Sequence, residues 1–375
     1  MDSLDLARSL IDFRTESPPG NEGPCARFVA DFLRDLHIDG AEVELHDFEE
    51  GRSNVVATLG GPEPGLLLAG HLDVVPAVDA DSWTSPPYDA RVRNGRLYGR
   101  GSSDMKSGIA AMLAAIASAK GKRTKRALSF VATAGEESGF DGLYALVRDG
   151  RMKGVRARCG VVGEPTEMKV VRGHRGGLSC RVVFQGRSAH AGDPSLGINA
   201  IESCALFLKS LGPLRRRLAG SRDPDLGITT VTPTMVSGGT KSNVIPGSCE
   251  LTIDSRVVPA LGTKAVLDAL NSLIDELGNR HADFRARAEV IYEGPALSVP
   301  REAEVVRLAE SLTGTSSGVA AYCTEAPVYC ELGTPTVVLG PGSVRQAHTL
   351  DEYAPVREIK SAQSVYRRMI EKVCL

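Results

Sequence analysis

The segment 126-RALSFVATAGEESG-139 joins an apolar run to a glycine-bordered turn that carries two adjacent glutamates. Its uninterrupted apolar stretch is typical of a strand buried on both faces of a parallel sheet. Neighbouring side chains of a strand point to opposite faces, so Glu136 and Glu137 could not share a site within the strand itself. Gly135 and residues 138–139 mark the departure into a turn, where both carboxylates can approach one cleft.

Apolar strands alternate with helical patterns on both sides of this segment. We expect further strands in NVVATLG (54–60), GLLLAGHLD (65–73) and CGVVGEP (159–165), and a buried helix in KSGIAAMLAAIASAK (106–120). This alternation predicts an α/β fold, in which a mostly parallel sheet is covered by helices on both faces.

The pattern changes near residue 174. Between 174 and 285, paired strands and two helices predict a small α+β domain, and the α/β alternation resumes from about residue 286. A chain of 375 residues is long for a single core. We therefore expect one domain made of residues 1–173 and 286–375, interrupted by a second domain of residues 174–285.

Composition argues against several classes of partner. The content of 42% hydrophobic and 24% charged residues is ordinary, and a net charge of −2 gives no reason to expect nucleic acid or an anionic membrane. No stretch approaches the roughly 20 apolar residues of a spanning helix, and the N-terminal residues lack the basic start of a signal peptide. Eight scattered cysteines without a C-x-x-C pair fit reduced thiols, so we expect a cytoplasmic protein.

Acids and imidazoles recur where the predicted strands end. His71 and Asp73 end the strand 65–73, Glu164 lies in the turn after CGVV, and His348 follows the apolar stretch PTVVL (335–339). In open α/β sheets, ligands bind at the carboxyl edge of the strands. Each of these residues taken singly is better explained as part of a polar loop, but the four together with the glutamate pair favour one site.

Asp104 comes from a fifth turn, just before the buried helix 106–120. A helix cap is its ordinary interpretation, and a phosphate loop is disfavoured because Met105 stands where the Walker pattern needs a glycine. As a metal ligand, one carboxylate could bridge two ions. Two imidazoles, two terminal acids and one bridging acid suffice for a pair of ions about 3.5–4 Å apart. Without thiolates, this set suits zinc, cobalt or manganese.

The motifs resemble those of a known family, the co-catalytic zinc aminoacylases and exopeptidases, which includes acetylornithine deacetylase, succinyl-diaminopimelate desuccinylase and glutamate carboxypeptidase. The resemblance covers nearly the whole chain. Its motifs occur in the family's order: GHLDVVP, LYGRGSSDMKSG, ATAGEESG, GEPT, GRSAHAGDPSLGINAI, SNVIP and AHTLDEY.

The resemblance implies a role for each residue of the site. Asp104 would bridge two Zn²⁺ ions per subunit, with Co²⁺ or Mn²⁺ able to substitute. One ion would be completed by His71 and Glu164, the other by Glu137 and His348. Asp73 would orient His71, and Glu136 would act as the general acid and base.

The resemblance also implies that the inserted domain is a lid that forms a homodimer. His190 in GRSAHAGDP would reach the partner subunit's active site and help to hold the oxyanion, although spacing alone indicates only a polar turn. Arg256 and Asn243 resemble positions that hold the substrate carboxylate or the oxyanion, and an exposed arginine at a strand end is the alternative for Arg256. Thr324 is included as a substrate-binding candidate, and His174 is left open.

The expected reaction is metal-dependent hydrolysis of the amide of an N-acyl amino acid, with N-acetylornithine and a place in arginine biosynthesis as first choice. The stretch YCTEAPVYCELGTPTVVLGPGSVRQAHTLDEY (322–353) resembles acetylornithine deacetylase more than the desuccinylase. Desuccinylation of succinyl-diaminopimelate and removal of a C-terminal glutamate are the alternatives within enzymes. A catalytically dead dimeric relative is the alternative outside them.

Overall fold

The computed structural model describes residues 2–375, which form two compact units. The first unit contains the chain up to Gly173, Val299–Gly318 and Thr324–Leu375, and the second contains His174–Ser298 and Val319–Cys323.

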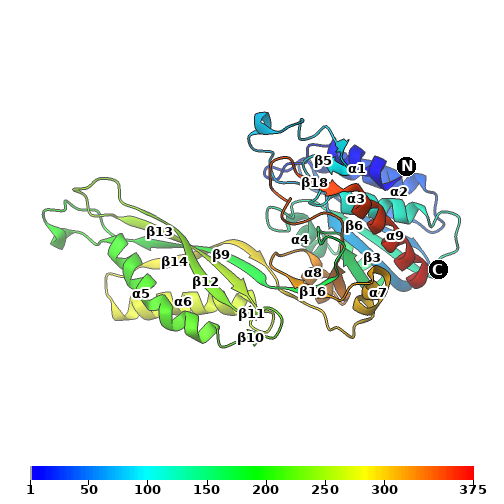
Figure 1. Cartoon of the computed structure of the whole chain (residues 1–375). Coiled ribbons are helices and arrows are strands. Elements are labelled where there is room, and N and C mark those ends of the chain that lie inside the picture. Colours follow the sequence, from blue (N-terminus) through cyan, green and yellow to red (C-terminus); the bar gives the residue numbers. More distant parts are fainter. Residues whose placement is uncertain (1) are drawn as a thin grey trace. The chain divides into compact units, whose positions relative to one another are not determined.

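The first unit is built on a mainly parallel sheet, as the alternating pattern predicts (Figure 1). At its centre β3 (Glu63–His71) pairs in parallel with β6 (Arg126–Thr133) and β7 (Ala157–Val162), and β7 pairs in parallel with β17 (Thr336–Val338). The other strands of this sheet in the first unit pair antiparallel: β1 (Glu42–Glu49), β2 (Arg52–Gly60) and β8 (Val171–His174). The central strands are apolar throughout because helices cover them.

Helix α3 (Lys106–Ala117) is buried along almost its whole length and packs between α1 (Ser3–Ile11) and α9 (Val356–Val373). Its alanines and glycine allow this close approach: a Cβ on Gly108 would overlap the carbonyl of Gly163, which follows β7. The remaining helices of this unit are α2 (Gly23–Asp35), α4 (Asp141–Arg148), α7 (Glu304–Thr313) and α8 (Ala326–Glu331). A small antiparallel sheet contains β4 (Arg91–Arg93), β5 (Arg96–Tyr98) and β18 (Tyr353–Pro355).

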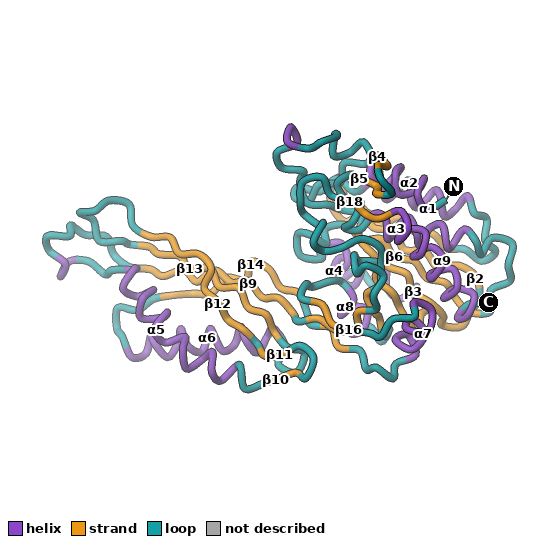
Figure 2. The backbone as a smooth tube through the Cα atoms, viewed as in Figure 1, coloured by secondary structure: helices purple, strands orange, loops and turns teal. Residues whose placement is uncertain are grey.

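The second unit is an antiparallel sheet with two helices (Figure 2). Its strand order is β12 (Thr230–Gly238), β13 (Ser248–Val257), β9 (Gly176–Gln185) and β14 (Ala286–Gly294). Burial alternates along β13, so one face of the sheet packs on α5 (Ala200–Leu218) and α6 (Thr263–Arg280). Short strands complete the chain: β10 (Arg222–Asp223), β11 (Gly227–Ile228), β15 (Leu297–Ser298) and β16 (Gly318–Ala320).

The boundary between the units lies later than residue 286. Strand β14 begins at Ala286 and pairs antiparallel with β9 along its length, so it belongs to the second unit. The return to the first unit therefore falls at Val299, and the short segment Val319–Cys323 also joins the second unit.

No helix within residues 2–375 is both long enough and apolar enough to cross a membrane.

Candidate metal centre

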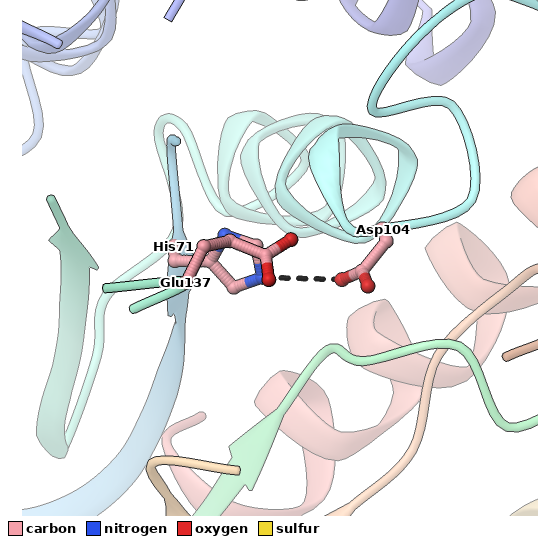
Figure 3. A group of neighbouring side chains, drawn as sticks. All are labelled: His71, Asp104 and Glu137. Atoms are coloured by element: carbon pink, nitrogen blue, oxygen red, sulfur yellow. Dashed lines mark hydrogen bonds and ion pairs between the residues drawn. The ribbon is translucent and has the colours of Figure 1, made fainter. Parts of the chain in front are cut away.

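The carboxyl ends of the central strands meet where the sequence predicted a site. His71 is the last residue of β3 and lies opposite Thr133, the last residue of β6. The glutamate turn follows β6, and Glu164 follows β7. Ligand atoms of His71, Asp104 and Glu137 lie within 4.8 Å of one another, and Figure 3 shows these three side chains side by side.

Asp104 lies between the two imidazoles of the site. Its Oδ1 is 3.1 Å from Nε2 of His71, and its Oδ2 is 3.4 Å from Nε2 of His348. The two oxygens of one carboxylate thus face two different imidazoles, which is the arrangement of a ligand shared by two cations.

Each imidazole has a second carboxylate next to it. Glu164 Oε1 is 3.5 Å from Nε2 of His71, and Glu137 Oε1 is 3.0 Å from Nε2 of His348. The structure therefore brings together the five residues singled out from the sequence, in two imidazole–carboxylate pairs around Asp104.

The ionisable groups of this cluster lie close enough to shift one another's pKa values. Burial, followed by the charge of Asp104, raises the pKa of Glu164 to about 8. Hydrogen bonds to Asp104 and Glu137 raise the pKa of His348 to about 10. Although burial opposes it, Glu164 and Asp104 also raise the pKa of His71 well above its ordinary value.

The donor set fits divalent cations. Carboxylates that are withdrawn from water and close to one another need neutralising charge, and a metal ion supplies it. Imidazole nitrogen and carboxylate oxygen without thiolate suit zinc, cobalt or manganese. Two such ions would have His71 with Glu164 and His348 with Glu137 as terminal ligands, and Asp104 would be common to both.

Asp73 holds the site in two ways. Nδ1 of His71 lies 3.0 Å from the backbone oxygen of Asp73 and 3.5 Å from its Oδ1, so Asp73 lies where it can orient the ring. The same carboxylate accepts the backbone N–H groups of Glu136 and Glu137, both at 3.1 Å. One fully buried acid therefore orients both the imidazole and the glutamate turn.

Glu136 and Glu137 lie in a turn after the end of β6, so the alternation of side chains along a strand does not separate them. Gly135 has φ +73°, a left-handed conformation that favours glycine, and a Cβ there would overlap the guanidinium of Arg52. Beyond this turn Glu137 contacts His348. Burial, and then the charges of Glu164 and Glu137, raise the pKa of Glu136 well above its ordinary value.

Two buried residues near this turn were missed by the sequence reasoning. Asn54 accepts the N–H of Ala134 at 2.9 Å and donates to the carbonyl of Gly142 at 3.0 Å, so it ties both ends of the glutamate turn. Glu325 lies 2.6 Å from the hydroxyl of Thr133 at the end of β6. Asn54 stands in no recognisable motif, and Glu325 lies in the stretch 322–353 without a role of its own there. Only the fold brings these two residues to the site.

His190 and Asn243 lie on neighbouring segments of the second unit. The N–H of Ala191 donates to the carbonyl of Asn243 at 2.9 Å, and His190 forms a β-bridge with Val244. Nδ1 of the exposed His190 accepts the N–H of Gly192 at 3.0 Å. In the neutral form of this ring the proton then lies on Nε2, from which it can be donated to a ligand in a hydrogen bond.

The remaining residues considered in the sequence analysis are held by hydrogen bonds or by burial within the protein. Arg256 donates from Nε and Nη2 to the carboxylate of Asp254, at 3.0 and 3.3 Å. Thr324 is fully buried and its hydroxyl accepts the N–H of Ala326 at 3.2 Å, and its part in substrate binding stays a prediction. His174 is also fully buried, and burial lowers its pKa to about 4.

A sheet edge with two imidazole–carboxylate pairs around a shared carboxylate is the arrangement of a metal-dependent hydrolase. Comparison with known proteins agrees, since the chain belongs to the peptidase family M20/M25/M40, whose model matches residues 67–372. It is therefore a metal-dependent enzyme that hydrolyses amide bonds.

Individual relatives extend over the whole chain. Acetylornithine deacetylase from Shigella sonnei is 33% identical over 373 residues, which cover 98% of this chain and 96% of the relative. The M20 metallo-carboxypeptidase Sso-CP2 from Sulfolobus solfataricus has the same fold, with a TM-score of 0.81, 18% identity and 99% of each chain covered. A dinuclear metal-binding M20 peptidase from Bacillus subtilis matches with a TM-score of 0.67 and 16% identity, covering 98% of this chain and 97% of its own.

Proposed function

We propose that this enzyme removes the acetyl group from N-acetylornithine with two bound Zn²⁺ ions, for which Co²⁺ or Mn²⁺ can substitute. The observation that carries the hydrolytic part is the position of Asp104, whose two oxygens face His71 and His348. The choice of substrate is supported by the 33% identity to a deacetylase over almost the whole of both chains. A role in arginine biosynthesis in the cytoplasm follows from that choice.

Five side chains would hold the ions: Asp104 between them, His71 with Glu164, and His348 with Glu137. Bound there, the ions would lower the pKa of the attacking water and polarise the amide carbonyl. Asp73 keeps Nδ1 of His71 engaged, so that Nε2 faces the site.

Glu136 is assigned the proton transfers. It accepts a proton from the attacking water and later delivers it to the nitrogen of the leaving amine. Burial and nearby carboxylates raise its pKa, which brings a carboxyl group nearer to the working pH of a general base. Its backbone N–H is fixed by Asp73, which limits the movement of the turn.

Residues of the second unit would act on the substrate in a homodimer. His190 of one subunit would donate from Nε2–H to the oxyanion formed in the other subunit, and the tautomer set by Gly192 supports this role. Asn243, on the neighbouring segment, would share that task. Arg256 would bind the substrate carboxylate after exchanging its present partner, Asp254.

A hydrolysis panel with added Zn²⁺ or Co²⁺ tests the proposal. It compares N-acetylornithine, other N-acetyl amino acids, succinyl-diaminopimelate and a peptide ending in glutamate. We expect the highest kcat/KM for N-acetylornithine. A clear preference for succinyl-diaminopimelate or for the peptide would overturn the choice of substrate, and no hydrolysis of any amide in the metal-loaded protein would overturn the reaction.

A further inference from the structure

We propose that Glu352 is a positioning residue that holds the shared ligand Asp104 against the His348 loop and so joins the two metal positions into one site. The inference rests on the proposed dinuclear function. It concerns a residue to which the hydrolytic mechanism above gives no part.

Glu352 is fully buried and its two carboxylate oxygens accept four hydrogen bonds. Oε1 accepts the backbone N–H groups of Ser103 at 2.7 Å and of Asp104 at 3.0 Å. Oε2 accepts the N–H of Gly101 at 3.0 Å and the guanidinium of Arg100 at 2.7 Å. One side chain therefore fixes three of the four backbone N–H groups that lead up to and include that of the shared ligand.

The same residue belongs to the segment that delivers His348. Strand β18, which starts at the next residue, pairs with β5, and the N–H of Gly99 donates to the carbonyl of Glu352 at 3.0 Å. Ser103 adds a second link between the segments, because its hydroxyl donates to the carbonyl of Ser343 at 3.0 Å and accepts the N–H of Ser343 at 2.9 Å.

The backbone of the His348 segment is itself unusual. His348 has φ +63° and Asp351 has φ +52°, a conformation that residues other than glycine rarely adopt. Such conformations persist where the surroundings determine them. The hydrogen bonds of Glu352 and Ser103 hold this segment in its conformation. They therefore set the positions of Asp104 and His348 together.

Replacing Glu352 by glutamine tests whether its hydrogen-bond acceptors, rather than the space that its side chain fills, support the site. The amide keeps the shape of the side chain, but its NH₂ group must face donors at Gly101 and Arg100 or at Ser103 and Asp104. At least one pair of N–H groups then loses its acceptor. We expect the shared ligand to shift and both cations to bind less tightly, by about 10- to 100-fold, as is usual when the support of a metal ligand is removed.

Arg100 offers a matched control. Arg100→Met removes the ion pair of Glu352 at a nearly fully buried position but leaves its three backbone hydrogen bonds in place. If Glu352 acts through the backbone of the Asp104 turn, R100M lowers the melting temperature yet keeps the metal affinity within about threefold of wild type, whereas E352Q loses metal affinity.

The experiment titrates the metal-free full-length chain with Co²⁺, measures binding by calorimetry and records the visible spectrum of the bound ions. Two tight ions in wild type, weakened binding with an altered spectrum in E352Q, and retained binding in R100M support the proposal. Wild-type affinities and spectrum in E352Q overturn it, as does equal weakening in both variants. If E352Q does not fold, Glu352→Asp, which keeps the charge but not the reach, replaces it under the same criteria. Failure of wild type to bind two ions would instead contradict the proposed dinuclear function.

Discussion

At the scale of single residues, the proposed mechanism gives different roles to the two adjacent glutamates of the turn after β6. Glu137 contacts His348 and belongs to the metal cluster. Glu136 lies beside it in the chain, and its backbone N–H is bound to the same carboxylate of Asp73. Because one carboxylate accepts both backbone N–H groups, the position of the turn is fixed for both residues, as the proposed roles of metal ligand and proton carrier require.

Substitution Glu136→Gln is expected to lower kcat by about 10²- to 10⁴-fold while two metal ions remain bound, because the amide cannot accept the proton of the water. The measurement is steady-state hydrolysis with metal analysis of the same sample. Glu63→Gln, at an exposed carboxylate of β3, is the control and should keep full activity. Near-wild-type turnover in E136Q would show that another group is the base.

Substitution Asp73→Asn is expected to weaken metal binding by about 10- to 100-fold and to lower kcat as well. Asparagine can accept only one of the N–H groups of Glu136 and Glu137, and its NH₂ group would repel the other. Metal affinity by competition with a chelator, together with kcat at saturating metal, checks both effects. If saturating metal restored the full kcat, Asp73 would act on His71 alone.

At the scale of elements, the strands and the residues at their ends were predictable because apolar runs and turn residues are local signals. The partners of those residues were not. Glu352 contacts Asp104 across 248 positions and Asn54 contacts Ala134 across 80, and only the paired strands bring them together. The end of the second unit was misplaced for the same reason, since β14 belongs to it by pairing with the distant β9.

The buried end of β8 predicts a pH effect. Burial lowers the pKa of His174 to about 4, below its ordinary value of 6.5. A folded-state pKa below the unfolded one gives stability that is complete above pH 6.5 and is lost as the pH falls through 4. The shift corresponds to about 3 kcal/mol. The free energy of unfolding should therefore fall more steeply between pH 6.5 and 4 in wild type than in His174→Gln.

Urea unfolding at several pH values measures this difference. The contrast is taken between wild type and variant at each pH, so that acid effects shared by both proteins cancel. Parallel curves for the two proteins would mean that His174 takes up its proton without opposing the fold.

At the scale of the whole molecule, the proposed mechanism needs two chains. Glu136 belongs to the first unit and His190 to the second. The second unit has two edge strands, and large apolar side chains are exposed on them: Met235 and Val236 on β12, Val290 and Ile291 on β14. Edge strands and exposed apolar side chains are common features of surfaces that bind another chain, and they support the proposed homodimer.

Mixing two inactive variants tests whether His190 acts across the dimer. Glu136→Gln lacks the base but has an intact His190, and His190→Ala has the reverse. In a heterodimer, the site with Glu136 receives His190 from its partner and is active, while the other site lacks both. Random exchange of subunits in an equal mixture makes half of the dimers mixed, so about a quarter of the wild-type activity per subunit should return.

Subunit exchange is confirmed separately with a charge-tagged copy. If exchange occurs and the activity stays at the level of the separate variants, His190 serves its own chain or does not take part in the reaction.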